Sequence, residues 1–122
     1  MSDALLDAAA RAYALVCLSD GRVDWPEDRA FASRMAHDPS FSQFEREDLE
    51  AAAAIAMGSI RGEQSFHEVA RAIARLVDAP EEREAVMRAA RAAVVADGGI
   101  RDQEERALEA LAGALGFDVS KA

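Results

Sequence analysis

The chain has 122 residues and a formal net charge of −9, with 23 acidic residues against 14 lysines and arginines. This length is enough for one domain with a real core but too short for two. The basic residues are nearly all arginines scattered among acidic neighbours, so the sequence has no basic stripe for nucleic acid and disfavours anionic lipid. Cations and basic protein surfaces are the partners that this charge favours.

The composition indicates an all-α fold. Hydrophobic residues make up 51% of the chain, alanine alone about a quarter, and aromatic residues only 6%. Alanine is the best helix former, and strand-forming residues are few. The N-terminus lacks the pattern of a signal peptide, and no apolar run is long enough to span a membrane. We therefore expect a single cytoplasmic domain over residues 1–122.

Helices are predicted in the first half of the chain by apolar residues at steps of three and four. The first covers residues 4–18, with one apolar face that includes Tyr13. The second begins near Trp25, and a turn follows at residues 37–40. The third helix is predicted to begin at a capping box formed by Ser42 with a glutamate three residues later, and to end between residues 57 and 60.

The second half repeats this arrangement of caps and apolar faces. A fourth helix is predicted after Ser65, and a fifth begins at a capping box with Asp78 and continues to Ala96. The sixth covers residues 102–115, and Gly116 is its predicted C-terminal stop. The expected fold is a compact bundle of about six helices.

A short acidic motif occurs twice, each time between two predicted helices. "SDGRVDWPE" covers residues 19–27 and "ADGGIRDQE" covers residues 96–104, and both match D-G-x-[V/I]-x-x-x-E. The match makes Asp20 equivalent to Asp97 and Glu27 equivalent to Glu104. The flanking helices therefore form two related helix–DG–helix hairpins. An approximate two-fold axis between such hairpins would bring the two acidic corners together.

Two interpretations of this corner remain open. In the first the corner is purely structural: the glycines leave their helices with positive φ, Val23 and Ile100 turn inward, and the glutamate belongs to a capping box. Two features favour a further role. Arg101 stands where the first copy has the capping Asp24, yet Glu104 is present. The two motif aspartates also follow helix C-termini, where the macrodipole disfavours negative charge and a bound cation would offset it.

The motif also matches the second half of an EF-hand loop, with Asp at position five, Gly at six, an aliphatic residue at eight and Glu at twelve. Neither loop is an EF-hand, because apolar side chains stand at positions one and three. Two-fold packing would nevertheless bring four carboxylates together. We therefore predict a divalent-cation site for calcium, magnesium or manganese, formed by Asp20, Glu27, Asp97 and Glu104.

The paired corners and their alanine-rich helices resemble the TerB-like family, the tellurite-resistance protein B group. The resemblance covers nearly the whole chain, through "ALVCLSDGRVDWPEDRAF" and "AAVVADGGIRDQEERALEALAGALGFD". It implies an all-α fold, an acidic metal-binding cluster at the four carboxylates above, and no established enzymatic activity. Arg101 at the capping position and a short C-terminus depart from the family pattern.

Other residues give weaker candidates. His37, His67 and Cys17 lack a recognised zinc spacing, and no Ser-His-Asp or Cys-His order indicates acyl transfer. Trp25 lies inside the first corner and would anchor a protein partner if it were exposed.

The sequence therefore predicts a cytoplasmic, non-enzymatic bacterial module that acts in tellurite, metal or oxyanion stress through a divalent cation. The alternative is a protein–protein interaction scaffold whose acidic corners are structural caps. A protein partner or a homodimer is left open by both interpretations, and neither nucleic acid nor a membrane is expected as a partner.

Overall fold

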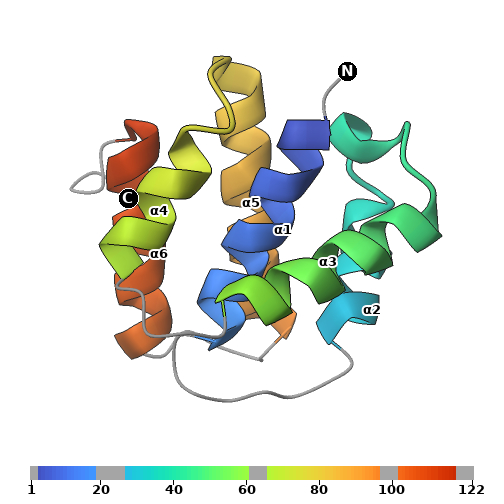
Figure 1. Ribbon diagram of the computed structural model, residues 1–122, viewed down its shortest axis with the longest axis horizontal. Coiled ribbons are helices and arrows are strands. Elements are labelled where there is room, and N and C mark those ends of the chain that lie inside the picture. The colour runs from blue at the N-terminus through green and yellow to red at the C-terminus, as the bar shows by residue number, and fades with distance from the viewer. Residues whose placement is uncertain (1–2, 19–26, 61–65, 97–101, 118–122) are drawn as a thin grey trace.

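The computed structural model describes residues 3–18, 27–60, 66–96 and 102–117. Within these ranges the chain forms six α-helices, one short 3₁₀ helix and no strand (Figure 1). The elements are α1 (Asp3–Leu18), α2 (Glu27–Met35), η1 (Pro39–Phe41), α3 (Arg46–Ile60), α4 (Phe66–Ala74), α5 (Pro80–Ala96) and α6 (Asp102–Leu115). The prediction of an all-α bundle is confirmed, and each predicted helix corresponds to an observed one.

The start of α3 differs from its prediction. The capping box places the N-cap at Ser42, but α3 begins four residues later, at Arg46. The 3₁₀ helix is the reason, because Ser42 ends it and donates its hydroxyl hydrogen bond to the Pro39 carbonyl at 3.0 Å. The cap of α3 is provided by Glu45, whose backbone N–H donates to the Asp48 carboxylate at 3.1 Å. One half of a capping box is thus present three residues further along, from the N-cap amide to the side chain at the third helical position.

The start of α5 lies one position after the predicted cap. The Arg83 amide donates to the Ala79 carbonyl at 3.0 Å, so Ala79 rather than Asp78 occupies the N-cap position. Pro80 is the first helical residue. Its fixed φ suits the helix, and its missing N–H would have had no partner in the first turn.

One arginine joins the C-terminal ends of α4 and α6. The Arg83 guanidinium donates to the carbonyl of Leu115 at 2.9 Å, to that of Val77 at 3.2 Å and to that of Ala74 at 3.4 Å. Carbonyl groups at a helix C-terminus have no partner within the helix and carry partial negative charge. A cation placed between two such ends therefore satisfies both and fixes α5 against α4 and α6.

Gly116 ends α6 as the sequence predicts. Its φ is +87°, a conformation that costs residues with a Cβ about 1 kcal/mol or more. The Phe117 amide donates to the Ala112 carbonyl at 2.8 Å, and the Gly116 amide donates to the Gly113 carbonyl at 3.3 Å. This pair of hydrogen bonds is a Schellman motif. It also fixes the backbone position of Phe117, which packs against the core.

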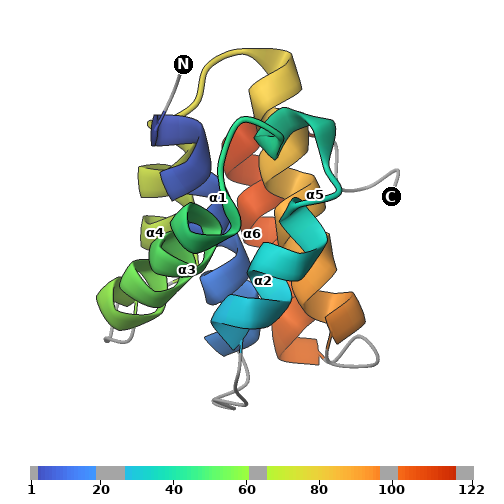
Figure 2. The ribbon, with the colours of Figure 1, turned by 90° about the vertical axis from the view of Figure 1, so that its right-hand side faces the viewer.

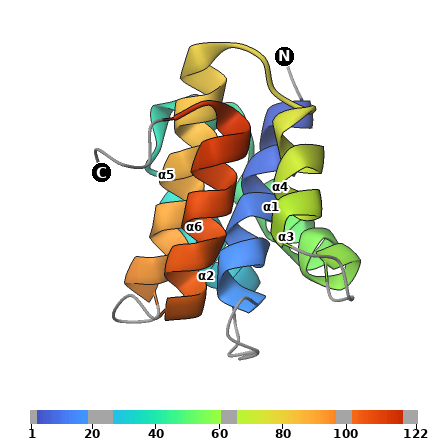
Figure 3. The ribbon, with the colours of Figure 1, turned by 90° about the vertical axis from the view of Figure 1, so that its left-hand side faces the viewer.

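The helix α1 runs through the centre of the bundle and contacts all five other α-helices (Figures 2 and 3). The prediction of one apolar face on α1 is therefore too narrow, because this helix is buried on nearly every side. Only a narrow strip that includes Asp7 and Arg11 is half-exposed, and these two form an ion pair at 2.8 Å. The largest fully buried side chains of the core are Tyr13, Phe31, Phe41, Leu49, Ile73 and Leu111.

The sequence repeat is present in the fold. The register that aligns the two motifs also places Asp3, the first residue of α1, on Pro80, the first residue of α5. Five positions on α1 and their equivalents on α5 have no exposed surface: Ala8, Ala9, Ala12, Tyr13 and Val16, and then Ala85, Val86, Ala89, Ala90 and Ala93. In addition α2 packs on α5, and α6 packs on α1. This exchange of neighbours is the one expected from an approximate two-fold axis between the hairpins.

Candidate functional site

The helix ends that flank the two acidic corners lie at the same end of the bundle. The C-terminal ends of α1 and α5 and the N-terminal ends of α2 and α6 are all at the lower end in Figures 1, 2 and 3. In addition, α1 packs extensively against α5. The location of the four helix ends is therefore compatible with a single cluster built from both corners.

The four predicted ligands lie within three residues of these ends in the sequence. Asp20 and Asp97 belong to the segments 19–26 and 97–101, which lie outside the described residues. Glu27 is the first residue of α2, and Glu104 is in the first turn of α6. Only the backbone of these two glutamates is described. The distances between the four carboxylates therefore stay a prediction.

The helix macrodipole affects the two glutamates and the two aspartates differently, because the glutamates lie at helix starts and the aspartates follow helix ends. Carboxylates in the first turn of a helix are stabilised by its macrodipole, which suffices to explain Glu27 and Glu104 without a ligand. Asp20 and Asp97 follow helix C-terminal ends, where the macrodipole acts against a negative charge. Four carboxylates form a donor set of hard oxygens that suits calcium, magnesium or manganese. The aspartates are thus the residues on which the two interpretations differ.

The remaining predictions for the corners fall on the same segments. Val23, Trp25 and Ile100 lie outside the described residues, and so does the side chain of Cys17. Their predicted burial or exposure stays a prediction.

The two histidines are both exposed, in the loop after α2 and in the first turn of α4. Among the side chains that the structure describes, no group of three or more His, Cys, Asp or Glu residues is placed to hold a metal ion. The four predicted ligands are not among those side chains.

A polar network that sequence reasoning missed connects α5 to η1. The Arg88 guanidinium donates to the two carboxylate oxygens of Asp38 at 2.8 and 3.2 Å and to the Ser40 hydroxyl at 3.0 Å. Asp38 also accepts from the Ser40 amide at 2.9 Å, which caps η1. The hydrogen bond from Arg88 lowers the pKa of Asp38, and Asp38 in turn raises the pKa of Arg88. A charged pair of this geometry holds the loop before α3 on α5.

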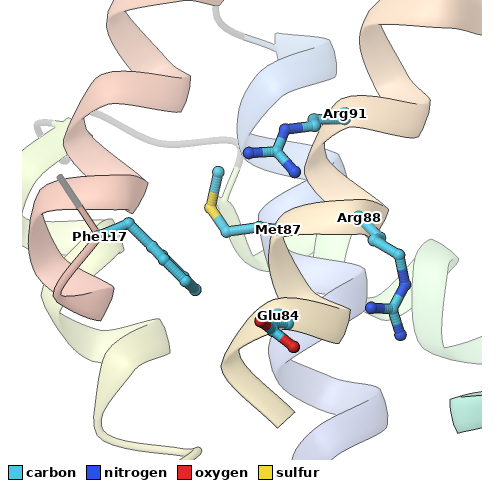
Figure 4. Close-up of a pocket in the computed structure, with 5 residues that line it drawn as sticks. All are labelled: Glu84, Met87, Arg88, Arg91 and Phe117. Carbon is cyan, nitrogen blue, oxygen red and sulfur yellow. The ribbon is translucent and has the colours of Figure 1, made fainter. Parts of the chain in front are cut away.

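A second feature that sequence reasoning missed is an open pocket of about 420 Å³ beside α5. Figure 4 shows Met87, Arg91 and Phe117 around the space between α5 and the residue that follows α6. Glu84 and Arg88 complete the lining, and Arg88 extends to the other side of α5 in this view. The sequence repeat contained an indication of this pocket. The register of the two motifs aligns Arg91 with Ala14, so α5 has a charged residue where α1 has an alanine.

Comparison with known proteins identifies the family. Among the described residues, none of the helices is both long and apolar enough to cross a membrane. Neither curated proteins nor solved structures gave a match to this chain. Residues 6–122 match the family described as tellurite resistance protein TerB. This match covers nearly the whole chain, so the chain belongs to the TerB family.

Proposed function

We propose that this TerB-family chain is a cytoplasmic, non-enzymatic module that binds a divalent cation through Asp20, Glu27, Asp97 and Glu104 and acts in tellurite, metal or oxyanion stress. The observation that carries the proposal is the common location of the four helix ends from which these residues come. The family description supports the stress context.

The physical basis of the cation response is electrostatic repulsion. Four carboxylates at one end of an already acidic protein repel one another and lower the stability of the cation-free fold. A divalent cation removes this repulsion and binds only when both corners are in place. Since a ligand that binds the folded state alone stabilises it by mass action, cation binding and folding are coupled.

Thermal unfolding tests the proposal directly. We expect calcium, magnesium or manganese to raise the melting temperature in a saturable way above the value in chelator, at constant ionic strength. The double variant Asp20→Asn with Asp97→Asn should lose this response and be as stable as the cation-free wild type, or more so. A matched double variant with the same change of charge on exposed residues of α3 and α6, Glu47→Gln with Glu109→Gln, should keep the response.

The scaffold alternative makes the opposite prediction. If the corners are structural caps, cations have no effect beyond salt screening, and the Asp20→Asn and Asp97→Asn changes lower stability because turn hydrogen bonds are lost. Identical melting of the wild type in calcium, magnesium, manganese and chelator would end the metal proposal and leave the scaffold.

A further inference from the structure

The outer face of α5 is open, although the equivalent face of α1 is covered. Helix α1 is packed by α3 and α4 as well as by α2, α5 and α6, whereas α5 packs mainly on α1, α2 and α6. The consequence is plain at one pair of equivalent positions, because Ala14 is fully buried and Arg91 is exposed. The two long helices of the repeat thus differ. The outer face of α1 is covered by other helices, and the equivalent face of α5 is not.

The open face has a mixed lining in which Phe117 is the main apolar surface. Met87, at the bottom of the 420 Å³ pocket, is only 4% exposed and adds a small apolar floor. Phe117 stands opposite it and is half-buried, with its backbone held by the 2.8 Å hydrogen bond to the Ala112 carbonyl. A thioether and an aromatic ring adapt well to a large apolar side chain. The pocket therefore provides contacts for an apolar group from outside.

The charged groups around this pocket are not equivalent. Arg88 is held by Asp38 and Ser40, so its hydrogen-bonding capacity is largely used. The Arg91 guanidinium has no hydrogen bond or ion pair with any residue that the structure describes, and the side chain turns toward Phe117 in Figure 4. Glu84 lies one turn before Arg88, at the other end of the pocket. In a chain of net charge −9, Arg91 is thus a cation available to an outside anion.

The geometry points to a docking site on α5 for a segment of a partner protein that carries a large apolar side chain next to a carboxylate. The apolar side chain would pack between Met87 and Phe117, and the carboxylate would accept a forked pair of hydrogen bonds from Arg91. A protein segment is favoured over a small molecule because the pocket is only partly enclosed, whereas small-molecule sites enclose most of their ligand. Phenylalanine, methionine and arginine are also the residues enriched at protein interfaces. This inference is independent of the proposed cation site.

Selection from a random peptide library displayed on phage, with the full chain immobilised in chelator, tests the inference. We expect the enriched peptides to combine a large apolar residue with a nearby aspartate or glutamate. The strongest of these, made synthetically with a fluorescent label, should perturb the amide NMR signals of residues 84–91 and 117 when it binds.

Variants then separate the apolar and the charged contacts. Arg91→Glu should weaken the binding of that peptide by about tenfold or more, since it replaces attraction by repulsion. Phe117→Ser removes the aromatic wall but keeps the glycine cap, and the same loss of about tenfold is expected. Glu84→Gln should tighten binding about two- to fivefold because it removes a like charge from the lining. Arg71→Glu, a control at an exposed position on α4, should change affinity less than about twofold.

Three results would overturn the inference. Enrichment of basic peptides, or of none, would show that the pocket does not select an acidic partner. Free 3-phenylpropionate that binds as tightly as the peptide would make the occupant a small molecule. A dimer of the wild type that sedimentation detects and that Arg91→Glu abolishes would make the occupant a second copy. Failure of the proposed cation site would not change any of these results, because the peptide experiments are carried out in chelator.

Discussion

The two long helices α1 and α5 occupy equivalent places in the repeat but have different surroundings. Both contribute small, fully buried residues to the contact between them. Away from that contact they differ: Asp7 and Arg11 of α1 pair with each other and are half-buried, whereas their equivalents Glu84 and Arg88 are exposed. Arg88 turns to a carboxylate outside its own helix, that of Asp38.

The difference follows from what lies between the two copies. The helices α3 and α4 stand between the hairpins in sequence, and both pack on α1. A duplicated pair of hairpins can form the same internal contact twice, but α3 and α4 pack on α1 and have no comparable packing on α5. The outer face of α5 is therefore free to present charged and apolar groups to other molecules. This comparison explains why a pocket lies beside α5, whereas the equivalent face of α1 is covered by other helices.

Exchange of the residues at positions 14 and 91 gives the largest expected effect. Ala14→Arg would place a charge without a partner at a fully buried position of α1, so we expect a loss of about 4 kcal/mol or more in the free energy of unfolding. The reverse change, Arg91→Ala, should alter stability by less than about 0.5 kcal/mol. Urea unfolding measures both. Similar values for the two variants would show that α1 and α5 are not covered differently.

A smaller effect is expected at Arg83, which stands in α5 where α1 has Leu6. Replacing it by that residue, Arg83→Leu, removes the donors for carbonyls of Leu115, Val77 and Ala74. The expected loss in the free energy of unfolding is about 2 kcal/mol, because carbonyls at two helix ends lose their partner. Arg75→Leu, at an exposed position just after α4, serves as the control in the same urea experiment. Equal stability of the two variants would contradict the proposed role of Arg83.

The smallest of these effects concerns Asp38 and Arg88, and it depends on pH. Asp38 has a pKa below its usual value of 3.8 because Arg88 donates to its carboxylate. A lowered folded-state pKa contributes stability above the unfolded pKa that is lost as the pH falls through the folded one. At pH 7 Asp38→Asn should therefore cost about 1 kcal/mol, a modest figure because the Arg88 side chain is 45% exposed.

The same pair gives a test by double-mutant cycle. The coupling between Asp38→Asn and Arg88→Gln should be constant from about pH 5 to 7 and shrink below about pH 4, where Asp38 in the unfolded chain takes up a proton. Chemical unfolding across this pH range measures it. A coupling that stays the same down to pH 2 would mean that the ion pair is not its source.

Local chemistry explains which sequence predictions succeeded and which did not. Gly116 was predictable as a stop because its positive φ is a property of its own backbone. The true position of Ser42, at the end of a 3₁₀ helix and not at the start of α3, was not predictable. The pattern Ser-x-x-Glu fits an N-cap equally well whether or not Pro39 starts a 3₁₀ turn just before it. The four carboxylates stay a prediction from spacing, and the spacing predicts their helix ends but not the distances between their side chains.

By itself, the sequence determined the helices, the register that relates the two hairpins, the acidic corners and the family resemblance. These depend on periodicity, caps and motif spacing, which act within one helix or one turn. Only the tertiary structure decided that α1 is enclosed while α5 is open, that Arg83 joins two helix ends, and that Arg88 pairs with Asp38 across 50 residues. Burial and pairing depend on which neighbours reach a side chain, and the equivalent helices α1 and α5 have different neighbours because α3 and α4 both pack on α1 and not comparably on α5.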